Sequence, residues 1–570
     1  MARIAPSAQL KSRGLSTFVI SLLAAALTQP AIAQSTTRAS LAPGDAEISG
    51  GARLGGTQNC ISDDGRFVVF ATDDDGVVTG DTNHASDVFL RDLWLNETFL
   101  VSHDGNGSPG DDYSWQAALS ADGSTVVFAS AATNLVPPDK NSSVDIFAWD
   151  RLTDTLSRIS DSYTGTRSHG RSEAPSVSSD GQLIAFSSWA FDLVPSDTNG
   201  EPDIFVHDRS TGTTTRVSLT ESGVEADRYR ICTLPTISRD GGTVCFVTDA
   251  DLVAGDTNNL HIYAVDRATA SIELIDVTES GLPVPYAELK PAFMSGDGRF
   301  VAFFDRHGVI LDGDIDQFGG AYLRDRLLDV TEFLSVDSEG NGIDSEFGSW
   351  VHSISADGRF VAFDGYGPAY GYDSLEWTCM VRDREFGFTL PIPFGDDDVL
   401  SDQPTSGVSL SMDGRFYAFT SADDSLVSND TNHSTDVFVR ERIFDVAKVV
   451  EYGNGTTGRL GIPSFALNDL PMLGKDLTLT IGNSSGLWTV AALLVGSASD
   501  DLPLYGGSLL VVPDFASALP LAPGSNVLDF CVPVDESLVG ISLFTQALLL
   551  DPWACDGVAM TAGIEVAPGY

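Results

Sequence analysis

The hydrophobic positions of this chain recur in short runs that do not alternate with polar residues. Seven such runs are FVVF (67–70), VVF (126–128), LIAF (183–186), VCF (244–246), FVAF (300–303), FVAF (360–363) and FYAF (416–419). Their length and their branched and aromatic residues predict β-strands. A strand that is apolar on both sides has to be covered on both faces. We therefore expect each run to lie in a sheet that packs between two other sheets.

A polar signature precedes each of these runs. Ser-x-Asp-Gly occurs seven times, with its glycine at positions 65, 123, 181, 241, 298, 358 and 414, at intervals of 56 to 60 residues. Asp-Gly between two strands signals a hairpin, for which we expect positive φ at both central turn residues. Regular spacing over seven copies indicates that one structural unit has been repeated.

The third repeat displays the whole unit. One strand ends at residue 177, and three more are predicted at 183–187, 203–207 and 214–219. Four antiparallel strands per repeat, covered on both faces, predict an all-β fold: a seven-bladed β-propeller of four-stranded antiparallel blades. A linear β-solenoid is the alternative, but four-stranded repeats of this length fit blades better.

The pattern divides the chain into three parts. We predict a signal peptide at 1–33, the propeller at 34–450 and a small β-sandwich domain at 451–570. The blades are expected near 58–102, 116–160, 174–219, 234–277, 291–336, 352–394 and 407–450. Residues 36–41 resemble the outer strand 214–219, so they can complete blade 7 and close the ring. Residues 446–450 can fill the same place, and the sequence leaves both open.

The C-terminal part contains no repeat. Its strand-like runs lie at 477–481, 489–495, 508–512, 527–532 and 538–544, separated by Gly, Pro, Asn and Asp. Aromatic and branched residues with frequent turn signals are typical of a β-sandwich.

The repeats resemble the WD40-like propeller repeats of the TolB family. The likeness is carried by SADGRFVAF (355–363) and SMDGRFYAF (411–419), and it covers about residues 36–450. Such propellers occur in periplasmic protein-binding proteins, in prolyl-oligopeptidase-like enzymes and in some polysaccharide lyases, so the resemblance implies a fold rather than one function. PLYGGSLLVVPD (503–514) and SLVGISLFTQALLLDP (537–552) resemble a β domain found on many secreted bacterial proteins.

The first residues have the features of an export signal. Arg3, Lys11 and Arg13 precede an apolar run at 18–27, and Ala31-Ile32-Ala33 offers small residues for cleavage. The run is shorter than the roughly 20 apolar residues that span a bilayer, and no later segment is expected to span one. We therefore expect a secreted protein, extracellular or at the cell surface, with the periplasm as the alternative.

The net charge of the chain limits the classes of molecule that we expect it to bind. The chain has 80 acidic and 32 basic residues, for a net charge of -48, which becomes -51 when the three basic residues of the signal are removed. Such a field repels nucleic acid and anionic membranes and favours cations. An extracellular protein or glycan remains as the expected partner, and we expect the chain to be a monomer.

Six cysteines are consistent with an oxidising compartment. Cys232 with Cys245, and Cys531 with Cys555, are candidate disulfides, whereas Cys60 and Cys379 have no obvious partner. No pair has CxxC spacing, which argues against a structural zinc site.

The loop between the second and third strands carries a recurring Asp-x-Asn-x-x-x-Asp. It stands at Asp81/Asn83/Asp87, Asp139/Asn141/Asp145, Asp197/Asn199/Asp203 and Asp430/Asn432/Asp436. Oxygen ligands at alternating loop positions suit a hard cation, so Ca²⁺ is the cofactor that these twelve residues predict. The alternative is turn chemistry, because Asp and Asn side chains bond to their own backbone.

Signals for catalysis are weak. The sequence has neither HExxH nor GxSxG, and basic–acidic pairs such as Arg91-Asp92 recur in nearly every blade, which favours structural ion pairs. The repeat is interrupted at residues 366–377, and this insert offers a candidate ligand site with the alternative of a decayed repeat. Its candidate residues are Tyr370, Tyr372, Asp373, Glu376 and Trp377.

These features predict a secreted, non-enzymatic propeller that binds a protein or glycan through one rim. The alternative is a carbohydrate-active enzyme of the polysaccharide lyase type on the same scaffold, which would need convergent titratable groups at one end of the central channel.

Overall fold

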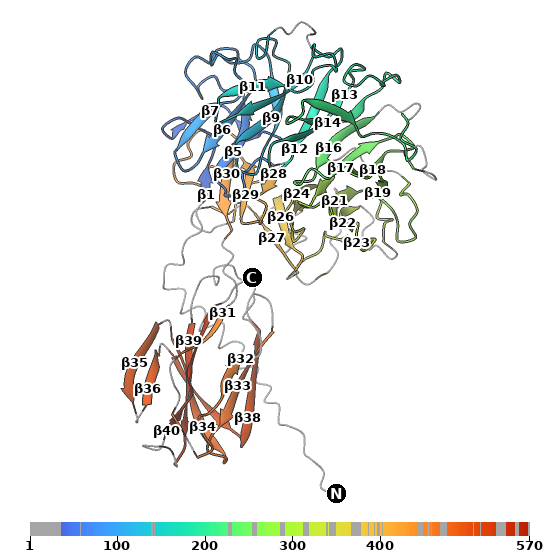
Figure 1. Ribbon diagram of the computed structural model, residues 1–570. Coiled ribbons are helices and arrows are strands. Elements are labelled where there is room, and N and C mark those ends of the chain that lie inside the picture. The colour runs from blue at the N-terminus through green and yellow to red at the C-terminus, as the bar shows by residue number, and fades with distance from the viewer. Residues whose placement is uncertain are drawn as a thin grey trace. The chain divides into compact units, whose positions relative to one another are not determined.

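The computed structural model describes residues 36–567 except 57–58, 138–140, 142, 226–230, 254–258, 286–290, 312–318, 338–339, 341–348, 366–377, 386, 393, 396–399, 402, 443–447, 453–455, 458, 468–475, 497, 505–506, 514, 532–542, 553 and 555–557. The described residues form strands and turns but no helix (Figure 1). They fall into two compact units, one of Gln34–Arg442 and one built from Ile443–Tyr570. The predicted signal peptide at 1–33 lies outside the described residues.

The first unit contains seven four-stranded antiparallel sheets in its described residues, one for each Ser-x-Asp-Gly repeat. Blade 1 consists of β4 (Ala52–Leu54), β5 (Phe67–Thr72), β6 (Asp87–Asp92) and β7 (Glu97–Leu100), and blade 2 of β8 (Ser114–Leu119), β9 (Thr125–Ser130), β10 (Asp145–Asp150) and β11 (Thr155–Arg158). Blade 3 consists of β12 (Ser172–Val177), β13 (Leu183–Ser188), β14 (Asp203–Asp208) and β15 (Thr213–Arg216). Blade 4 consists of β16 (Cys232–Ile237), β17 (Thr243–Thr248), β18 (His261–Asp266) and β19 (Ile272–Leu274).

Blades 5 to 7 follow the same order, except that the outer strand of blade 7 comes from the start of the chain. They are β20 (Phe293–Met294), β21 (Phe300–Asp305), β22 (Gly320–Asp325) and β23 (Val330–Phe333); β24 (Val351–Ile354), β25 (Phe360–Gly365), β26 (Thr378–Asp383) and β27 (Phe388–Pro391); β28 (Thr405–Leu410), β29 (Phe416–Ser421), β30 (Asp436–Glu441) and β1 (Thr36–Arg38). A short hairpin of β2 (Leu41–Ala42) and β3 (Ala46–Glu47) follows β1. The prediction of an all-β propeller is confirmed.

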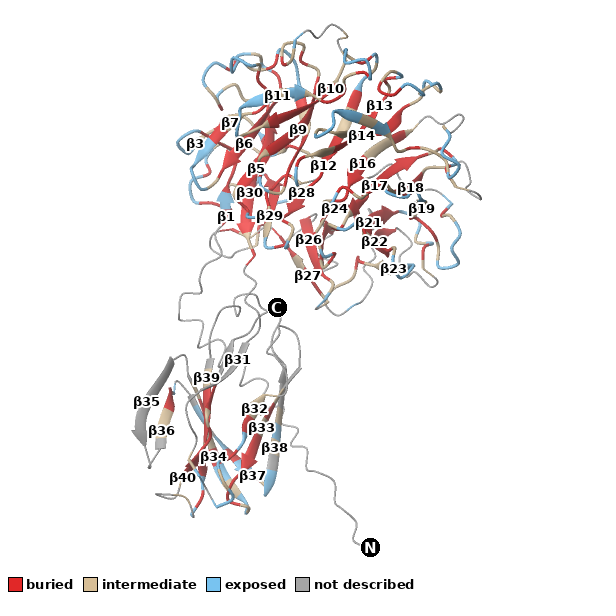
Figure 2. Ribbon diagram, viewed as in Figure 1, coloured by how far each residue is buried: buried red, intermediate tan, exposed pale blue. Residues whose placement is uncertain are grey.

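Each blade packs on its neighbours through strands that are buried on both faces. Every residue of β5 and β6 is buried, and Figure 2 shows the middle strands of the blades in red. One hydrophobic cluster joins Val69 and Leu90 of blade 1 to Phe128 and Phe147 of blade 2. Corresponding clusters join later blades to one another and blade 7 to blade 1. The cover that the apolar runs require on both faces is therefore supplied by neighbouring blades.

The Ser-x-Asp-Gly turns connect the first two strands of each blade. In blade 3 the Gly181 amide donates to the Ser178 carbonyl at 3.0 Å, and the Ser178 hydroxyl donates to Oδ1 of Asp180 at 2.6 Å. Gly181 has φ of 70°, but Asp180 does not have positive φ, so the expectation of positive φ at both residues is wrong. The glycine follows the two central turn residues instead of being one of them. Both contacts recur in all seven copies, so the serine and aspartate build the turn.

The variable residue of five of the seven signatures joins its turn to the next one around the axis. The amide of Ala121 donates to the carbonyl of Ser179 at 3.0 Å, and the amide of Ser179 donates to the carbonyl of Arg239 at 2.9 Å. Asp63, Gly296 and Ala356 make the corresponding contact to the following blade. These backbone hydrogen bonds connect the inner turns of neighbouring blades around the channel.

The N-terminal segment closes the ring. β1 pairs with β30 in antiparallel register, with Thr37 opposite Val439 and Arg38 opposite Phe438. β31 (Lys448–Tyr452), which contains part of the competing segment 446–450, instead pairs with β41 in the second unit. The alternative closure by residues 446–450 is therefore wrong, and the predicted boundary at residue 450 falls inside β31.

The second unit is also built of β-sheets. Besides β31 its strands are β32 (Phe465–Leu467), β33 (Asp476–Asn483), β34 (Thr489–Gly496), β35 (Ala498–Leu504), β36 (Gly507–Val512), β37 (Phe515–Leu521), β38 (Gly524–Cys531), β39 (Leu543–Leu550), β40 (Val558–Met560) and β41 (Gly563–Ala567). One hydrophobic core takes Leu479 and Ile481 from the sheet of β32, β33 and β38, and Ala491 and Leu549 from the sheet of β34 and β39. The predicted runs at 477–481, 489–495, 508–512 and 527–532 correspond to strands. Of the run at 538–544, residues 543–544 belong to β39, and residues 538–542 lie outside the described residues.

Candidate functional site

The blades have two different ends. The Ser-x-Asp-Gly turns and the short turns between third and fourth strands lie at one end, which we call the turn rim. The loops between second and third strands and the connections between blades lie at the opposite end, because the strands are antiparallel. We call that end the loop rim, and it carries all four predicted calcium loops.

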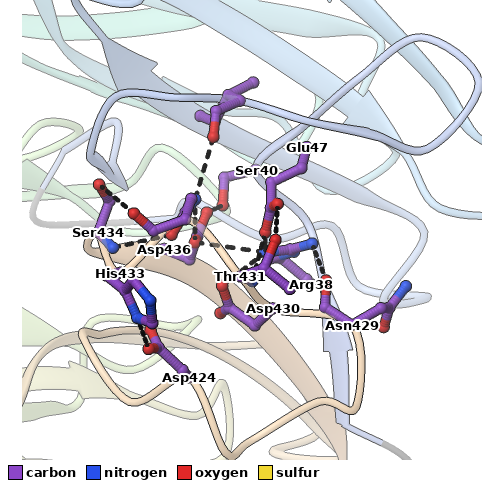
Figure 3. Close-up of polar contacts among 12 residues, drawn as sticks. Arg38, Ser40, Glu47, Asp424, Asn429, Asp430, Thr431, His433, Ser434 and Asp436 are labelled. Atoms are coloured by element: carbon purple, nitrogen blue, oxygen red, sulfur yellow. Dashed lines mark hydrogen bonds and ion pairs between the residues drawn. The ribbon is translucent and has the colours of Figure 1, made fainter.

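In blade 7 an arginine occupies the centre of the predicted calcium loop (Figure 3). Nη1 of Arg38 lies 2.8 Å from Oδ1 of Asp430 and 3.6 Å from Oδ2 of Asp436, and it donates to Oε1 of Glu47 at 2.7 Å. Arg38, Asp430 and Asp436 are all buried. The guanidinium therefore supplies the positive charge at the place where the sequence predicted a bound cation.

The asparagine of this loop turns its nitrogen toward the carboxylate. Nδ2 of Asn432 donates to Asp436 at 2.9 Å and to the carbonyl of Ile48 at 3.1 Å, while its Oδ1 accepts from the Ser434 amide at 2.8 Å. The Ser40 hydroxyl donates to the other oxygen of Asp436. These bonds are the turn chemistry that was the alternative to calcium.

Burial and hydrogen bonds shift the pKa values of the carboxyl groups around Arg38 in opposite directions. Burial, with Asp436 nearby, raises the pKa of Asp430 to about 6. Hydrogen bonds from Thr431 and from Arg38 lower the pKa of Glu47 to about 2. At neutral pH the cluster is therefore an internal ion network and not an open set of carboxylates.

Blades 2 and 3 place an arginine at the same position. In blade 3, Nη1 of Arg216 lies 3.0 Å from Oδ2 of Asp203 and 3.5 Å from Oδ1 of Asp197, and it also donates to Glu225. Burial, with Asp203 beside it, raises the pKa of Asp197 to about 7. In blade 2, Nη1 of Arg158 lies 3.7 Å from Oδ2 of Asp145. Asp139, the first predicted ligand of that loop, lies outside the described residues.

The asparagines of these two loops are oriented as in blade 7. Each of Asn141 and Asn199 points its Nδ2 at the last carboxylate of its own loop, at 3.5 Å. Oδ1 of Asn141 accepts from the Ser143 amide at 3.3 Å, and Oδ1 of Asn199 accepts from the Glu201 amide at 2.9 Å. The amide oxygens that would have to bind calcium are therefore bonded to the loop backbone. Calcium binding by Asn141 and Asn199 stays a prediction, and both side chains also make the turn contacts of the alternative.

Blade 1 has the acidic loop without the arginine. Leu100 stands opposite Phe89 in the outer strand, in the register that pairs Arg216 with Phe205, Arg158 with Phe147 and Arg38 with Phe438. Asp87 is fully buried, and burial raises its pKa to about 7 with a further contribution from Asp81. Nδ2 of Asn83 and the hydroxyl of Ser102 donate to the two oxygens of Asp87.

The basic–acidic pairs at the ends of third strands lie within and between blades. In the predicted pair Arg91-Asp92, Arg91 contacts Asp45 at 2.5 Å, and Asp92 contacts Arg66, which follows the Ser-x-Asp-Gly turn, at 2.6 Å. The Arg66 guanidinium lies 4.6 Å from the centre of the Phe67 ring. Arg151 of the next blade covers the same ring at 4.2 Å. Corresponding contacts surround Phe300 and Phe360. These arginines join neighbouring blades, as their repetition predicts.

The central axis is narrow at the turn rim. Its cavity of about 30 Å³ is lined by Arg239, Met294, Met412 and other first-strand or turn residues. Arg239 of blade 4 forms an ion pair with Asp63 of blade 1, on the far side of the ring.

Exposed aromatic residues gather on the loop rim of blade 3. The ring of Phe191 is 54% exposed and stacks on His169 at 5.5 Å, and Tyr163 is 58% exposed. The guanidinium of Arg171 lies 4.0 Å from the centre of the Trp189 ring. We name Tyr163, His169, Arg171, Trp189 and Phe191 the blade 3 patch.

Polar contacts fix the shape of this patch. Asp192 accepts from the amide of His169 at 3.0 Å and contacts its Nδ1 at 2.6 Å. The amide of Tyr163 donates to the carbonyl of Asp192 at 2.9 Å, which joins the inter-blade connection to the loop of blade 3. The His169 ring, on which Phe191 stacks, and the backbone of Tyr163 are therefore held by Asp192.

The blade 3 patch was not predicted, although the sequence contains its signal. Phe191 stands where blade 2 has Thr133 and blade 7 has Asp424, and Trp189 stands where they have Ala131 and Ala422. An aromatic residue at a repeat position that is small or polar elsewhere marks a surface that the ring itself does not require.

The remaining predictions concern the candidate ligand residues of the blade 6 insert and the two disulfides. The candidate ligand residues Tyr370, Tyr372, Asp373, Glu376 and Trp377 lie outside the described residues. Cys232 and Cys245 are buried free thiols, and each stands opposite a threonine in the sheet, so a disulfide between them is a wrong prediction. Cys555, in the other predicted disulfide, also lies outside the described residues.

No family model matches the chain, and no curated protein matches it. Among solved structures, TolB from Acinetobacter baumannii is 14% identical, with 66% of this chain and 80% of that chain covered and a TM-score of 0.32. A putative TolB from Agrobacterium tumefaciens is 12% identical, covering 68% and 96%, with a TM-score of 0.30.

A xyloglucanase from Xanthomonas campestris is 11% identical, covering 79% of this chain and 59% of that chain, with a TM-score of 0.38. At these identities the likeness concerns the fold alone. The chain is thus similar in fold to TolB-type and other β-propellers. The described residues include no helix long and apolar enough to cross a membrane.

Proposed function

We propose that this protein is a non-enzymatic binding propeller that acts outside the cytoplasm and engages a protein partner through the blade 3 patch. The observation that supports this most is the pre-arranged group of exposed aromatic rings beside Arg171. Tyrosine, tryptophan and arginine are the residues most enriched at binding hot spots. Export is supported by the signal sequence expected at 1–33.

The arrangement of titratable groups favours binding over catalysis. Two charged groups described near the axis, Asp63 and Arg239, form an ion pair with each other. The buried carboxylates of blades 3 and 7 are neutralised by Arg216 and Arg38. A lyase would need unpaired acid and base groups that converge on a substrate-sized pocket.

A binding screen tests this proposal. The mature chain is applied to purified extracellular proteins and, separately, to cell-envelope polysaccharides, and both arms are also assayed for turnover. We expect saturable binding in the protein arm and no product in either arm. Binding only to polysaccharide would replace the protein partner with a glycan, and release of unsaturated sugar products would establish the lyase alternative.

We also propose that calcium binding is confined to the loop of blade 1. That loop has the carboxylates of Asp81 and Asp87 but has Leu100 where blades 2, 3 and 7 have arginine. Two carboxylates without a cationic neighbour offer the oxygen donors that Ca²⁺ takes.

The variant Leu100→Arg tests the calcium proposal, because it gives blade 1 the arginine that blades 2, 3 and 7 have at this position. We expect calcium to raise the melting temperature of the wild-type chain and to leave that of L100R unchanged, because the guanidinium replaces the ion. Scanning calorimetry in calcium and in EDTA measures this. Equal melting temperatures of the wild type in both buffers would rule out the calcium proposal.

A further inference from the structure

A histidine, an aspartate and a cysteine meet on three adjacent strands of blade 6. Nε2 of His352 on β24 lies 2.6 Å from Oδ1 of Asp364 on β25, and Sγ of Cys379 on β26 lies 3.5 Å from the same oxygen. Asp364 and Cys379 stand directly opposite each other in the sheet. All three donor atoms lie within 4.8 Å of one another.

The propeller fold does not require these residues. The strand pair that holds Asp364 and Cys379 carries small or apolar pairs in other blades, such as Ala71 opposite Val88 and Ala129 opposite Ile146. Blade 7 has Thr420 opposite Val437. In blade 6, therefore, two neighbouring strands carry residues that can bind a metal ion at positions where other blades carry packing residues.

The environment of the cluster suits a bound cation. Cys379 is fully buried, while the side chains of His352 and Asp364 are 21% and 18% exposed, so one side of the cluster remains open to solvent. Burial, and then the carboxylate of Asp364, raise the pKa of the Cys379 thiol well above its usual range. A divalent ion would neutralise the carboxylate and favour the thiolate at the same place.

We propose that His352, Asp364 and Cys379 bind one divalent transition-metal ion, with zinc as the preferred ion. Imidazole nitrogen, carboxylate oxygen and thiolate sulfur are the three ligand types that zinc accepts, and three protein ligands leave a fourth position open. The absence of CxxC spacing argued against zinc only for pairs of cysteines, whereas this set uses one cysteine.

Metal entry requires small changes. Ligand atoms of a tetrahedral zinc site lie about 3.4 Å apart, so His352 and Asp364 have to separate by less than about 1 Å, and Cys379 has to lose its proton. Cys379 already lies 3.5 Å from Asp364. Because His352 and Asp364 are partly exposed, their side chains can move without rearranging the blade core.

Cobalt binding tests the proposal, since a thiolate ligand gives Co²⁺ a charge-transfer absorption in the near ultraviolet that the chain's many carboxylates do not give. The reduced, metal-free full-length chain is titrated with Co²⁺ and then with Zn²⁺. We expect the absorption to saturate at one equivalent of cobalt and to disappear when zinc displaces it.

Variants that restore the residues of other blades serve as the decisive comparison. Cys379→Val and Asp364→Ala introduce the residues of Val88 and Ala71, so both are expected to fold, which melting in EDTA checks. C379V should abolish the absorption, and D364A should weaken cobalt binding at least tenfold. The control Cys245→Ala removes another buried thiol, at a position that is Ala185 in blade 3, and should leave the absorption intact.

A wild-type chain without the absorption, or a C379V chain that retains it, would overturn the proposal. If C379V fails to fold, D364A decides: unchanged cobalt affinity contradicts the site, and a tenfold loss supports it. Neither result depends on the binding partner of the blade 3 patch, so this site and the proposed function stand or fall separately.

Discussion

At the scale of single residues, one outer-strand position decides the electrostatics of each acidic loop. Where this position is Arg38 or Arg216, the buried aspartates have a cationic neighbour within 3.6 Å. Where it is Leu100, the buried Asp87 has hydrogen-bond donors but no arginine in register. The same loop sequence is therefore an ion network with arginine in blades 3 and 7 and a hydrogen-bonded acidic loop without arginine in blade 1.

The pH dependence of stability should reveal Asp87. Its pKa rises from 3.8 to about 7 on folding, so its contribution to stability is complete below pH 3.8 and is lost as pH rises through about 7. Asp87→Asn removes this titration. We expect the melting temperature of D87N, relative to the wild type, to increase from pH 4 to pH 8 in calorimetry.

Asp203→Asn is the matched control, because Asp203 occupies the same place in blade 3 beside Arg216. It leaves a buried arginine with one partner fewer, which we expect to cost about 3 kcal/mol at pH 8. Parallel pH profiles for D87N and the wild type would contradict the assignment of a raised pKa to Asp87.

Sequence reasoning at this scale succeeded for the turns and was incomplete for the loops. Ser178 and Asp180 form the predicted turn, because their contacts are local in sequence. The arginine partners were missed. Arg216 follows Asp203 by 13 residues in the same blade, whereas Arg38 reaches Asp430 only after the outer strand has found its register across 392 residues of chain. A long-range pairing of this kind leaves no local pattern.

At the scale of elements, the ring depends on β1 as the outer strand of blade 7. Residues 36–38 pair with β30, and the Thr36 hydroxyl lies 3.0 Å from Nη1 of Arg440. The sequence could propose two candidates for this strand, because residues 36–41 and 446–450 are both short and β-prone. Pairing of β31 with β41 decided between them.

A disulfide across the closure tests this pairing. Thr37 and Val439 are directly opposite each other, so Thr37→Cys with Val439→Cys should oxidise spontaneously. Linking the two ends of the ring constrains the unfolded chain, and we expect a stabilisation of about 3 kcal/mol, measured by denaturant unfolding with and without reductant.

The control pairs Val439→Cys with Val449→Cys, which lies on β31 and pairs with Val566 in the second unit. It should remain reduced. A crosslink in the control and none in the T37C/V439C chain would mean that the competing segment closes the ring.

At the scale of the whole molecule, the repeat determines the fold, and departures from the repeat carry the function. The apolar runs and turn signatures were sufficient to predict a propeller, because the same packing problem is solved in every blade. The candidate sites could not be predicted in this way. The blade 3 patch and the His352 cluster appear only when each residue is compared with its counterparts in the other blades.

The acidic composition acts at this scale as well. With a net charge of -48, we expect electrostatic repulsion between the protein and nucleic acid or anionic membranes. The blade 3 patch contains Arg171 and exposed rings within that acidic background. It is therefore a local exception to the general surface, which is what a specific binding site requires.

The affinity of the patch variant for the partner found in the screen tests the central claim most directly. Tyr163→Ala combined with Phe191→Ala removes two exposed rings, and Leu327→Ala combined with Leu328→Ala removes equally exposed apolar side chains on the turn rim. By titration calorimetry, we predict that Y163A/F191A raises Kd at least tenfold, about 1.4 kcal/mol, while L327A/L328A binds like the wild type. Unchanged binding by Y163A/F191A, with loss of binding by L327A/L328A, would contradict the account.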